Sequence, residues 1–376
     1  MTELKNNVLD INNNKLQQVI VEYVFVDSYN NLRSKTHIIY PTWINTQEKD
    51  NQSEKGKEGV KPIFNIDICM IDCSIIDDNI HNDNIHNENK TKTNNTELFL
   101  VPRCLFNDPF NTSTEICKYL LCMCEIFNQD GKPYFINNRY KLYEIINAIG
   151  EDKIKEDEPL FSMQQEYFIV DSLNSNALYR NNSNNSNNCC VGYELNYGRI
   201  IAMEHMNYCV KAGIKLNEIK SILGYGKWSY RIDFYSQFEI CDNLWITRYI
   251  LQRIGELHKV SIHFNIKLNL QESMKSSCLF FYVNFSNKSM RGDNGIHTIV
   301  KTIENIKLVE NENNNQNDNH INNQNDNQIV NDYKIPMDIK LLGKGYFQYK
   351  TNKYNIDPYL ICTQLTKSVY PLTDYV

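Results

Sequence analysis

Phe161-Ser162-Met163-Gln164-Gln165-Glu166-Tyr167 is the stretch on which the prediction of the fold depends. It predicts a β-strand, in which residues two apart share a face, so Gln164 and Glu166 point one way and Gln165 and Tyr167 the other. Two acids at this spacing would bind a hard cation, Mg²⁺ or Mn²⁺. Only Glu166 carries a charge here. The stretch therefore indicates either a reduced metal site or a half-buried strand with one polar face.

The composition favours a two-domain protein of the cell interior. The chain has 376 residues, of which 41% are hydrophobic, enough for about two domains with a sizeable core. With 39 basic and 45 acidic residues the net charge is −6, which argues against nucleic acid or an anionic membrane as partner. The stretch from Met1 to Leu16 lacks the apolar core of a signal peptide, and no run is long enough to span a bilayer. We expect a cytoplasmic location.

Cysteine usage agrees with a reducing compartment. The chain has 12 cysteines, and their spacing gives no paired zinc framework. We expect reduced and mostly buried thiols.

Hydrophobic spacing predicts a mixture of strands and helices. Strands are expected at Val19–Val26, Leu32–Tyr40, Tyr119–Phe127 and Leu279–Phe285, and ordered structure is expected to resume at Leu98–Val101. Helices are expected at Arg139–Ile149, Tyr197–Ile214, Asn243–His258, Ile296–Val309 and Asp357–Ser368. Gly150 is expected to cap the C-terminal end of the first of these helices. Turns are expected at 28–31 and at 128–131, where Asp130-Gly131 is a hairpin signal, and residues 45–62 read as polar loop. Asparagine-rich tracts at 77–96, 174–188 and 310–330 read as disordered inserts.

Several motifs, taken together and in order, point to one family. They include Asn107-Asp108-Pro109-Phe110, Gln164-Gln165-Glu166-Tyr167, Gly226-Lys227-Trp228-Ser229-Tyr230, Asn284-Phe285-Ser286-Asn287-Lys288-Ser289-Met290-Arg291 and Gly345-Tyr346-Phe347-Gln348. The chain resembles glutamine synthetase of the eukaryotic (type II) kind. The resemblance implies an α+β fold. A flexible N-terminus (1–17) would precede a small β-grasp-like domain (18–110), followed by a larger catalytic-type domain (111–376) with a curved antiparallel sheet and helices.

The resemblance also implies a chemistry and an assembly. Members of the family form rings and join ammonia to glutamate through a γ-glutamyl phosphate made from ATP, with Mg²⁺ or Mn²⁺. The ligands of one metal fall on Glu166, Ile222 and Ser229, and those of the other fall on Gln164, Gln348 and Tyr282. Among these positions only Glu166 is unchanged. Because loss of even a supporting partner costs roughly 10–100-fold in affinity or activity, we expect the metal site as the family builds it to be absent.

Other positions of the family's site are retained in part. The resemblance implies nucleotide-binding residues at Asn284, Phe285, Ser286, Tyr346 and Phe347. It places substrate-binding positions at Lys350 and Lys334, where lysine keeps a charge but not the bidentate fork of arginine. Asp67 corresponds to a catalytic aspartate that assists ammonium across the subunit boundary.

Two functional hypotheses follow. The first is a pseudoenzyme that keeps the fold, and with it nucleotide binding, in a homo-oligomer or beside an active glutamine synthetase subunit. The alternative is an active ATP-dependent glutamate–ammonia ligase, with glutamate, ammonia and ATP as substrates and a rebuilt site in which Glu166, Gln164 and Gln348 surround one Mg²⁺. A gene-model error between residues 306 and 333 would also produce the missing motifs.

Overall fold

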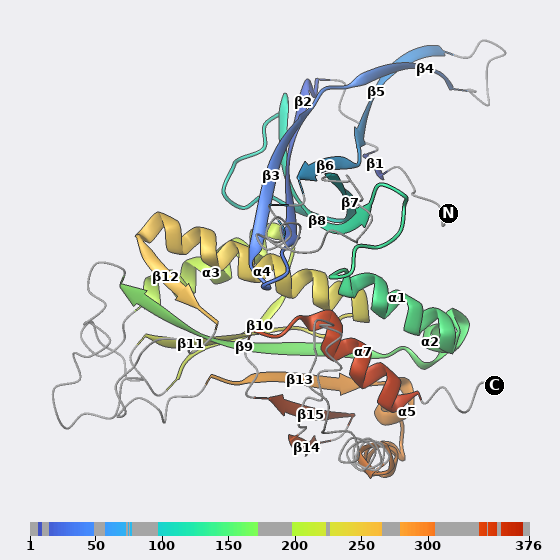
Figure 1. Cartoon of the computed structure of the whole chain (residues 1–376), viewed down its shortest axis with the longest axis vertical. Helices are drawn as coiled ribbons and strands as arrows, with labels where there is room; N and C mark the ends of the chain where they lie inside the picture. The colour runs from blue at the N-terminus through green and yellow to red at the C-terminus, as the bar shows by residue number, and fades with distance from the viewer. Residues whose placement is uncertain are drawn as a thin grey trace, which may run out of the picture. The chain divides into compact units, whose positions relative to one another are not determined.

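The computed structural model describes residues 7–9, 15–48, 57–72, 74, 76, 97–171, 198–222, 226–264, 279–304, 338–343, 345–351 and 355–370 (Figure 1). The chain divides into two compact units. Unit 1 comprises Met1–Tyr140 and Asn207–Ile214, and unit 2 comprises Lys141–Met206 and Lys215–Val376. The three asparagine-rich tracts lie outside the described residues.

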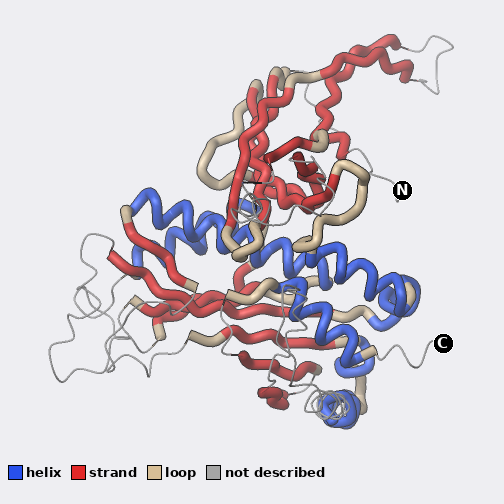
Figure 2. The backbone as a smooth tube through the Cα atoms, viewed as in Figure 1, coloured by secondary structure: helices blue, strands red, loops and turns tan. Residues whose placement is uncertain are grey.

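Unit 1 consists mainly of strands (Figure 2). Its five-stranded sheet has the order β3-β2-β8-β7-β6. The strands are β2 (Gln18–Val26), β3 (Leu32–Ile39), β6 (Cys69–Asp72), β7 (Glu97–Asn107) and β8 (Cys117–Asn128). Alternate side chains of β2, including Val19, Val21 and Tyr23, are buried in the core of this unit, as a strand with one core-facing side requires. The turn expected at 28–31 is confirmed, because Asp27 Oδ1 accepts hydrogen bonds from the backbone of Tyr29 and Asn31.

The polar loop predicted at 45–62 is wrong for the residues described. These residues contribute to a three-stranded sheet of β1 (Asn7–Leu9), β5 (Lys57–Ile66) and β4 (Thr42–Glu48). β4 and β5 pair antiparallel from Thr42↔Ile63 to Glu48↔Lys57. Backbone pairing satisfies N–H and C=O groups whatever the polarity of the side chains, so a polar sequence did not prevent strand formation.

The chain turns after β8 but makes no extended hairpin. The turn is held by a hydrogen bond from the backbone of Gly131 to Asn128 O, and the returning segment forms a single bridge, Phe127↔Pro133. Proline has no N–H to donate, which limits the pairing. Helix α1 (Asn138–Ile149) follows. Gly150, with φ of 103°, ends it as predicted by donating to Ile146 O.

Unit 2 is built on a seven-stranded sheet with the order β10-β11-β9-β13-β15-β14, in which β12 also pairs with β9. The strands are β9 (Leu160–Asp171), β10 (Leu216–Ser221), β11 (Lys227–Ile232), β12 (Val260–His263), β13 (Phe281–Ser286), β14 (Asp338–Gly343) and β15 (Tyr346–Thr351). All of the pairings are antiparallel. Together with the helices, this sheet confirms the predicted α+β class.

Helix α4 (Gln237–His258) covers one face of the unit 2 sheet, where it contacts β9, β11 and β12. Unit 2 also contains α2 (Glu151–Asp157), α5 (Lys288–Arg291) and α7 (Pro358–Val369), and residues 295–304 are helical. Helix α3 (Arg199–Ala212) begins in unit 2 and ends in unit 1. In Figure 1, α4 runs along β9, which it contacts. It begins at Gln237 rather than at the predicted Asn243, because Ser236 and Glu239 form a capping box at its start. No helix in the described ranges is both long and apolar enough to cross a membrane.

Candidate functional site

The two faces of β9 differ as its sequence predicts. On the helix-covered face, Gln165 Oε1 accepts a hydrogen bond of 3.1 Å from the Nε of Arg248 in α4. Arg248 is fully buried, and desolvation lowers the pKa of its guanidinium to about 10. Gln164 and Glu166 point to the opposite face, which we call the site face. It carries the positions that the resemblance assigns to metal ligands.

Glu166 is bound by a lysine on the neighbouring strand. Lys227 Nζ lies 2.8 Å from Glu166 Oε2, and the two side chains are only 6% and 5% exposed. The backbone N–H of Phe280 donates to the same carboxylate oxygen over 2.9 Å. The carboxylate that survives from the expected ligand set is therefore neutralised and hydrogen-bonded within the protein.

The remaining ligand positions on the site face also bond to each other or to their neighbours. Gln164 Nε2 donates to Ser229 Oγ over 3.4 Å, and Ser229 is the register partner of Glu166. Gln348 Nε2 donates to Asn284 Oδ1 over 3.1 Å. These amide groups are thus already used in holding adjacent strands together.

The last two ligand positions bring no acid to the face. Tyr282 is the register partner of Gln164, and desolvation, with a smaller contribution from the charge of Glu166, raises the pKa of its phenol to about 12. Ile222 follows β10, where its backbone N–H donates to Lys227 O over 2.9 Å. Neither residue offers a negative charge to a cation.

A divalent cation does not fit this set of donors. Mg²⁺ and Mn²⁺ prefer charged oxygen ligands, and the described residues contain no group of three or more His, Cys, Asp and Glu able to hold a metal. An ammonium already pairs with Glu166. At about 4 Å and an effective dielectric constant of about 20, repulsion between that charge and a divalent ion would be about 8 kcal/mol. The residues present therefore disfavour a cation where the family places one.

The nucleotide positions expected on β13 and β15 are divided between the two faces of the sheet. Phe285 and Phe347 are fully buried, and their ring centroids lie 5.4 Å apart in the core. Asn284 and Ser286 alternate with them and are buried on the site face, where Tyr346 is half-buried. The structure therefore brings Asn284, Ser286 and Tyr346 to one face, and it places the two phenylalanine rings on the other.

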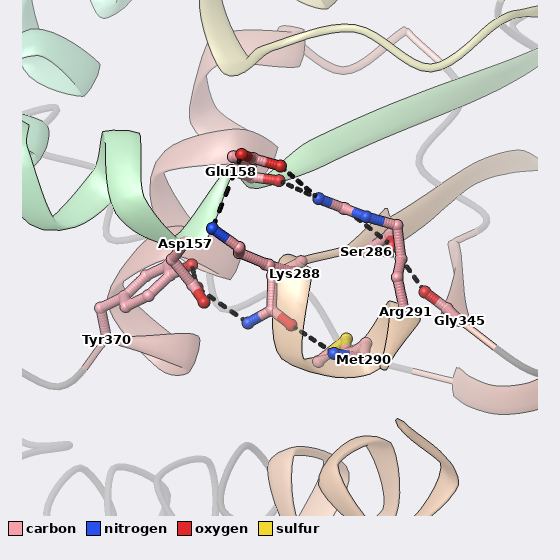
Figure 3. Close-up of polar contacts among 9 residues, drawn as sticks. Asp157, Glu158, Ser286, Lys288, Met290, Arg291, Gly345 and Tyr370 are labelled. Atoms are coloured by element: carbon pink, nitrogen blue, oxygen red, sulfur yellow. Dashed lines mark hydrogen bonds and ion pairs between the residues drawn. The ribbon is translucent and has the colours of Figure 1, made fainter. Parts of the chain in front are cut away.

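Ser286 belongs to a polar network that the sequence did not predict (Figure 3). Its hydroxyl donates to Gly345 O over 2.6 Å and accepts from Arg291 over 3.2 Å. Arg291 also donates to the backbone oxygen of Glu158 over 3.0 Å. The network shows that the hydroxyl already has partners within the protein, and it links the end of β13 to the start of β15.

A second part of the same network ties α2 to α5 and to the end of α7. Asn287 caps α5 by accepting from the backbone of Met290, and its amide donates to Asp157 over 2.8 Å. The hydroxyl of Tyr370 donates to the same Asp157 oxygen. The sequence signal for this arrangement was the position of Asn287, a favoured N-cap residue, three residues before Met290.

The predicted substrate and catalytic positions have different placements. Lys350 lies on the site face as the register partner of Tyr282, with its Nζ 3.7 Å from the centroid of the Phe280 ring. Asp67 lies in unit 1, between β5 and β6, with an exposed side chain and a backbone oxygen that accepts from Tyr23. Lys334 lies outside the described residues. Lys227 was not predicted as a site residue, because its role depends on the pairing of β11 with β9.

Similar proteins are known for most of the chain. A protein of Acanthamoeba polyphaga mimivirus, provisionally named a glutamine synthetase, is 25% identical over 377 residues and covers 96% of each chain. The chloroplastic glutamine synthetase of Chlamydomonas reinhardtii is 28% identical over 297 residues, which are 73% of this chain and 75% of that protein. The cryo-EM structure of Plasmodium falciparum glutamine synthetase has the same fold, with a TM-score of 0.61 at 12% identity, over 97% of this chain and 74% of that chain. No protein-family model matches the sequence.

Proposed function

We propose that the chain, as a member of the glutamine synthetase family, keeps the family's fold without forming glutamine. The observation that carries the proposal is the buried contact between Lys227 and Glu166. A lysine ammonium occupies the carboxylate that a catalytic cation would need. The protein then acts through its surfaces and assembly rather than through turnover.

The chemistry of ATP-dependent ligation explains why this contact is decisive. Phosphoryl transfer depends on positioning and on neutralising the charge of the phosphate oxygens, which enzymes achieve with carboxylate-held divalent cations. On the site face Glu166 is neutralised by Lys227, and the amides of Gln164 and Gln348 bond to Ser229 and Asn284. These residues supply hydrogen bonds between strands instead of a negative site for a cation.

Packing residues of the family motifs are retained while the polar positions are rebuilt. Trp228 and Trp245 are almost completely buried, and Pro358 begins α7 as a buried residue. Such positions stabilise the fold, whereas function depends on the site. We therefore propose that the chain assembles as a homo-oligomer or with a subunit of an active glutamine synthetase, and that it serves there as a scaffold or regulator.

The competing function is a ligase with a rebuilt site, in which Glu166, Gln164 and Gln348 surround one Mg²⁺. That site would require Lys227 to leave Glu166 and both amides to break their present hydrogen bonds. The geometry therefore favours the non-catalytic proposal.

The decisive experiment measures glutamine formation by the purified full chain. Glutamate, ammonium and ATP are supplied with Mg²⁺ or Mn²⁺, with an active glutamine synthetase as positive control and Glu166→Gln as the matched variant. We expect no product above the blank and no difference between the native chain and the variant. Turnover that Glu166→Gln abolishes would refute the proposal.

The assembly is tested separately by light scattering on the chain alone and mixed with an active glutamine synthetase. We expect a particle larger than a monomer in at least one of the two samples. Monomers in the first sample together with an unchanged enzyme particle in the second would remove the scaffold and regulatory roles.

A further inference from the structure

A row of hydrogen-bond donors crosses four neighbouring strands on the site face. Arg231 of β11 is the register partner of Gln164 of β9, and Gln164 is the partner of Tyr282 of β13. Tyr282 is in turn the partner of Lys350 of β15. Directly paired residues of antiparallel strands project from the same face. We call these four residues the donor row.

Among the described residues, no hydrogen-bond acceptor pairs with the phenol of Tyr282 or the ammonium of Lys350. The phenol of Tyr282 carries an O–H that can donate a hydrogen bond to an anion. The ammonium of Lys350 lies over the rings of Phe280 and Tyr282, at 3.7 and 5.9 Å from their centroids. Within the described part of the chain no carboxylate pairs with this ammonium. A ring face holds a cation but leaves it able to donate to an anion.

Arg231 adds a second cationic group at the other end of the row. Its guanidinium pairs with Glu218, while its Nε is buried and has no hydrogen-bond partner among the described residues. A buried donor without a partner costs free energy, and a bound oxygen atom would satisfy it. Within the described part of the chain, the row thus contains two donors without an acceptor, one at Arg231 and one at Tyr282, together with the ammonium of Lys350.

The charges next to the row favour an anion over a cation. Glu166 and Lys227 neutralise each other, and Glu218 is opposed by Arg231 and also by Lys220 at 3.0 Å. Asp338 of β14 is the register partner of Lys350. These groups therefore comprise three carboxylates and four cations, which leaves one positive charge unbalanced among them. Charge-assisted hydrogen bonds from such groups are the strong ones for carboxylates and phosphates.

We propose that the donor row binds an oxyanion, a carboxylate or a phosphate, without a divalent cation. Positions where the family resemblance places metal ligands, Gln164 and Tyr282, would then hold a ligand of the opposite charge. This inference rests on the proposed function, since it requires Lys227 to remain on Glu166. It identifies the class of small molecule to which a non-catalytic member of the family could respond.

Isothermal titration of the full chain in EDTA tests the proposal, with inorganic phosphate and succinate as separate probes. We expect at least one probe to bind, and the stronger of the two identifies the source of the oxyanion. Tyr282→Phe removes one donor and keeps the ring, and Lys350→Gln removes the charge. Each is expected to weaken binding about 10-fold, the usual effect of one hydrogen bond to a charged group.

Two further variants sharpen the test. Lys132→Gln removes a lysine whose side chain is 78% exposed in a turn of unit 1, and it is expected to leave binding unchanged. Asp338→Asn removes a negative charge from β14 at the register partner of Lys350, and it is expected to tighten binding. Thermal melting of each variant shows whether it is folded.

The outcomes separate this inference from the proposed function. No binding of either probe, binding that appears only when Mg²⁺ is added, or equal binding by native chain, Tyr282→Phe and Lys350→Gln would each overturn the donor row. Absence of both turnover and anion binding would leave the non-catalytic proposal standing and refute only the donor row. Glutamine formation dependent on Glu166 would refute the proposed function, whatever the titration shows.

Discussion

Replacing Lys227 by methionine is expected to destabilise the protein far more than the loss of an ordinary surface lysine. Methionine fills a similar volume but leaves the carboxylate of Glu166 buried without its cation. The two side chains are 6% and 5% exposed and their charged atoms lie 2.8 Å apart, so water can replace little of the lost interaction.

The expected magnitude follows from the burial of the pair. Removing one partner of a buried ion pair typically costs about 3–5 kcal/mol, whereas an exposed pair contributes about 0–1 kcal/mol. The hydrogen bond from the backbone of Phe280 to Glu166 remains in the variant, which places the expected loss near the lower limit, about 3 kcal/mol. Glu166→Gln combined with Lys227→Met removes both charges, and we expect this double variant to recover most of the loss.

Urea unfolding of the single and double variants measures these free energies as a double-mutant cycle. Lys220→Met is the matched control, because Lys220 pairs with Glu218 at a similar 3.0 Å in the same sheet but with side chains 44% and 33% exposed. Its loss should be below about 1 kcal/mol. The reasoning is refuted if Lys227→Met unfolds at the same urea concentration as Lys220→Met, or if the double variant is no more stable than Lys227→Met.

Three further predictions concern buried polar groups. Arg248→Met, which leaves buried acceptors without their donor, should lower stability in urea by about 3 kcal/mol, whereas Arg253→Met, with its side chain 44% exposed in the same helix, should cost less than about 1 kcal/mol. Burial lowers the pKa of His205 to about 4 in the folded chain. As the pH falls below about 6.5, the imidazole is protonated in the unfolded chain but stays neutral in the folded chain, which favours unfolding. The native chain should therefore lose about 2 kcal/mol between pH 7 and 5 that His205→Gln does not lose, and equal pH slopes would contradict this. Tyr370→Phe removes the hydroxyl that donates to Asp157 and should lower the free energy of unfolding, measured by thermal melting, by about 1 kcal/mol. An unchanged free energy of unfolding would show that this hydrogen bond does not stabilise the protein.

Local periodicity predicted the parts of the fold that depend on neighbouring residues. The alternation in Gln164-Gln165-Glu166 placed the amide and the carboxylate on one face, as the structure shows, because side-chain direction in a strand depends only on position. The C-terminal end of α1 at Gly150 was predicted for the same kind of reason. By contrast, the start of α4 was missed, although the capping box of Ser236 and Glu239 was present in the sequence.

The features that escaped prediction depend on contacts between distant segments. Lys227 becomes the partner of Glu166 only when β11 pairs with β9, and that register cannot be read from either segment alone. The polar strands β4 and β5 were read as loop because their pairing relies on backbone hydrogen bonds. Phe285 and Phe347 were grouped with Asn284 by motif, but the pleat of the strands sends their rings into the core.

The buried contact of Lys227 with Glu166 also limits how the lineage can change. A single substitution that removes Lys227 leaves the carboxylate of Glu166 buried without a counter-ion, which lowers the free energy of unfolding by about 3–5 kcal/mol. That is a large share of the about 5–15 kcal/mol by which a typical domain is stable. A variant that gains a metal at Glu166 would have to pass through such a weakened intermediate before any new ligand brought benefit. The contact therefore resists replacement of the lysine by a single substitution.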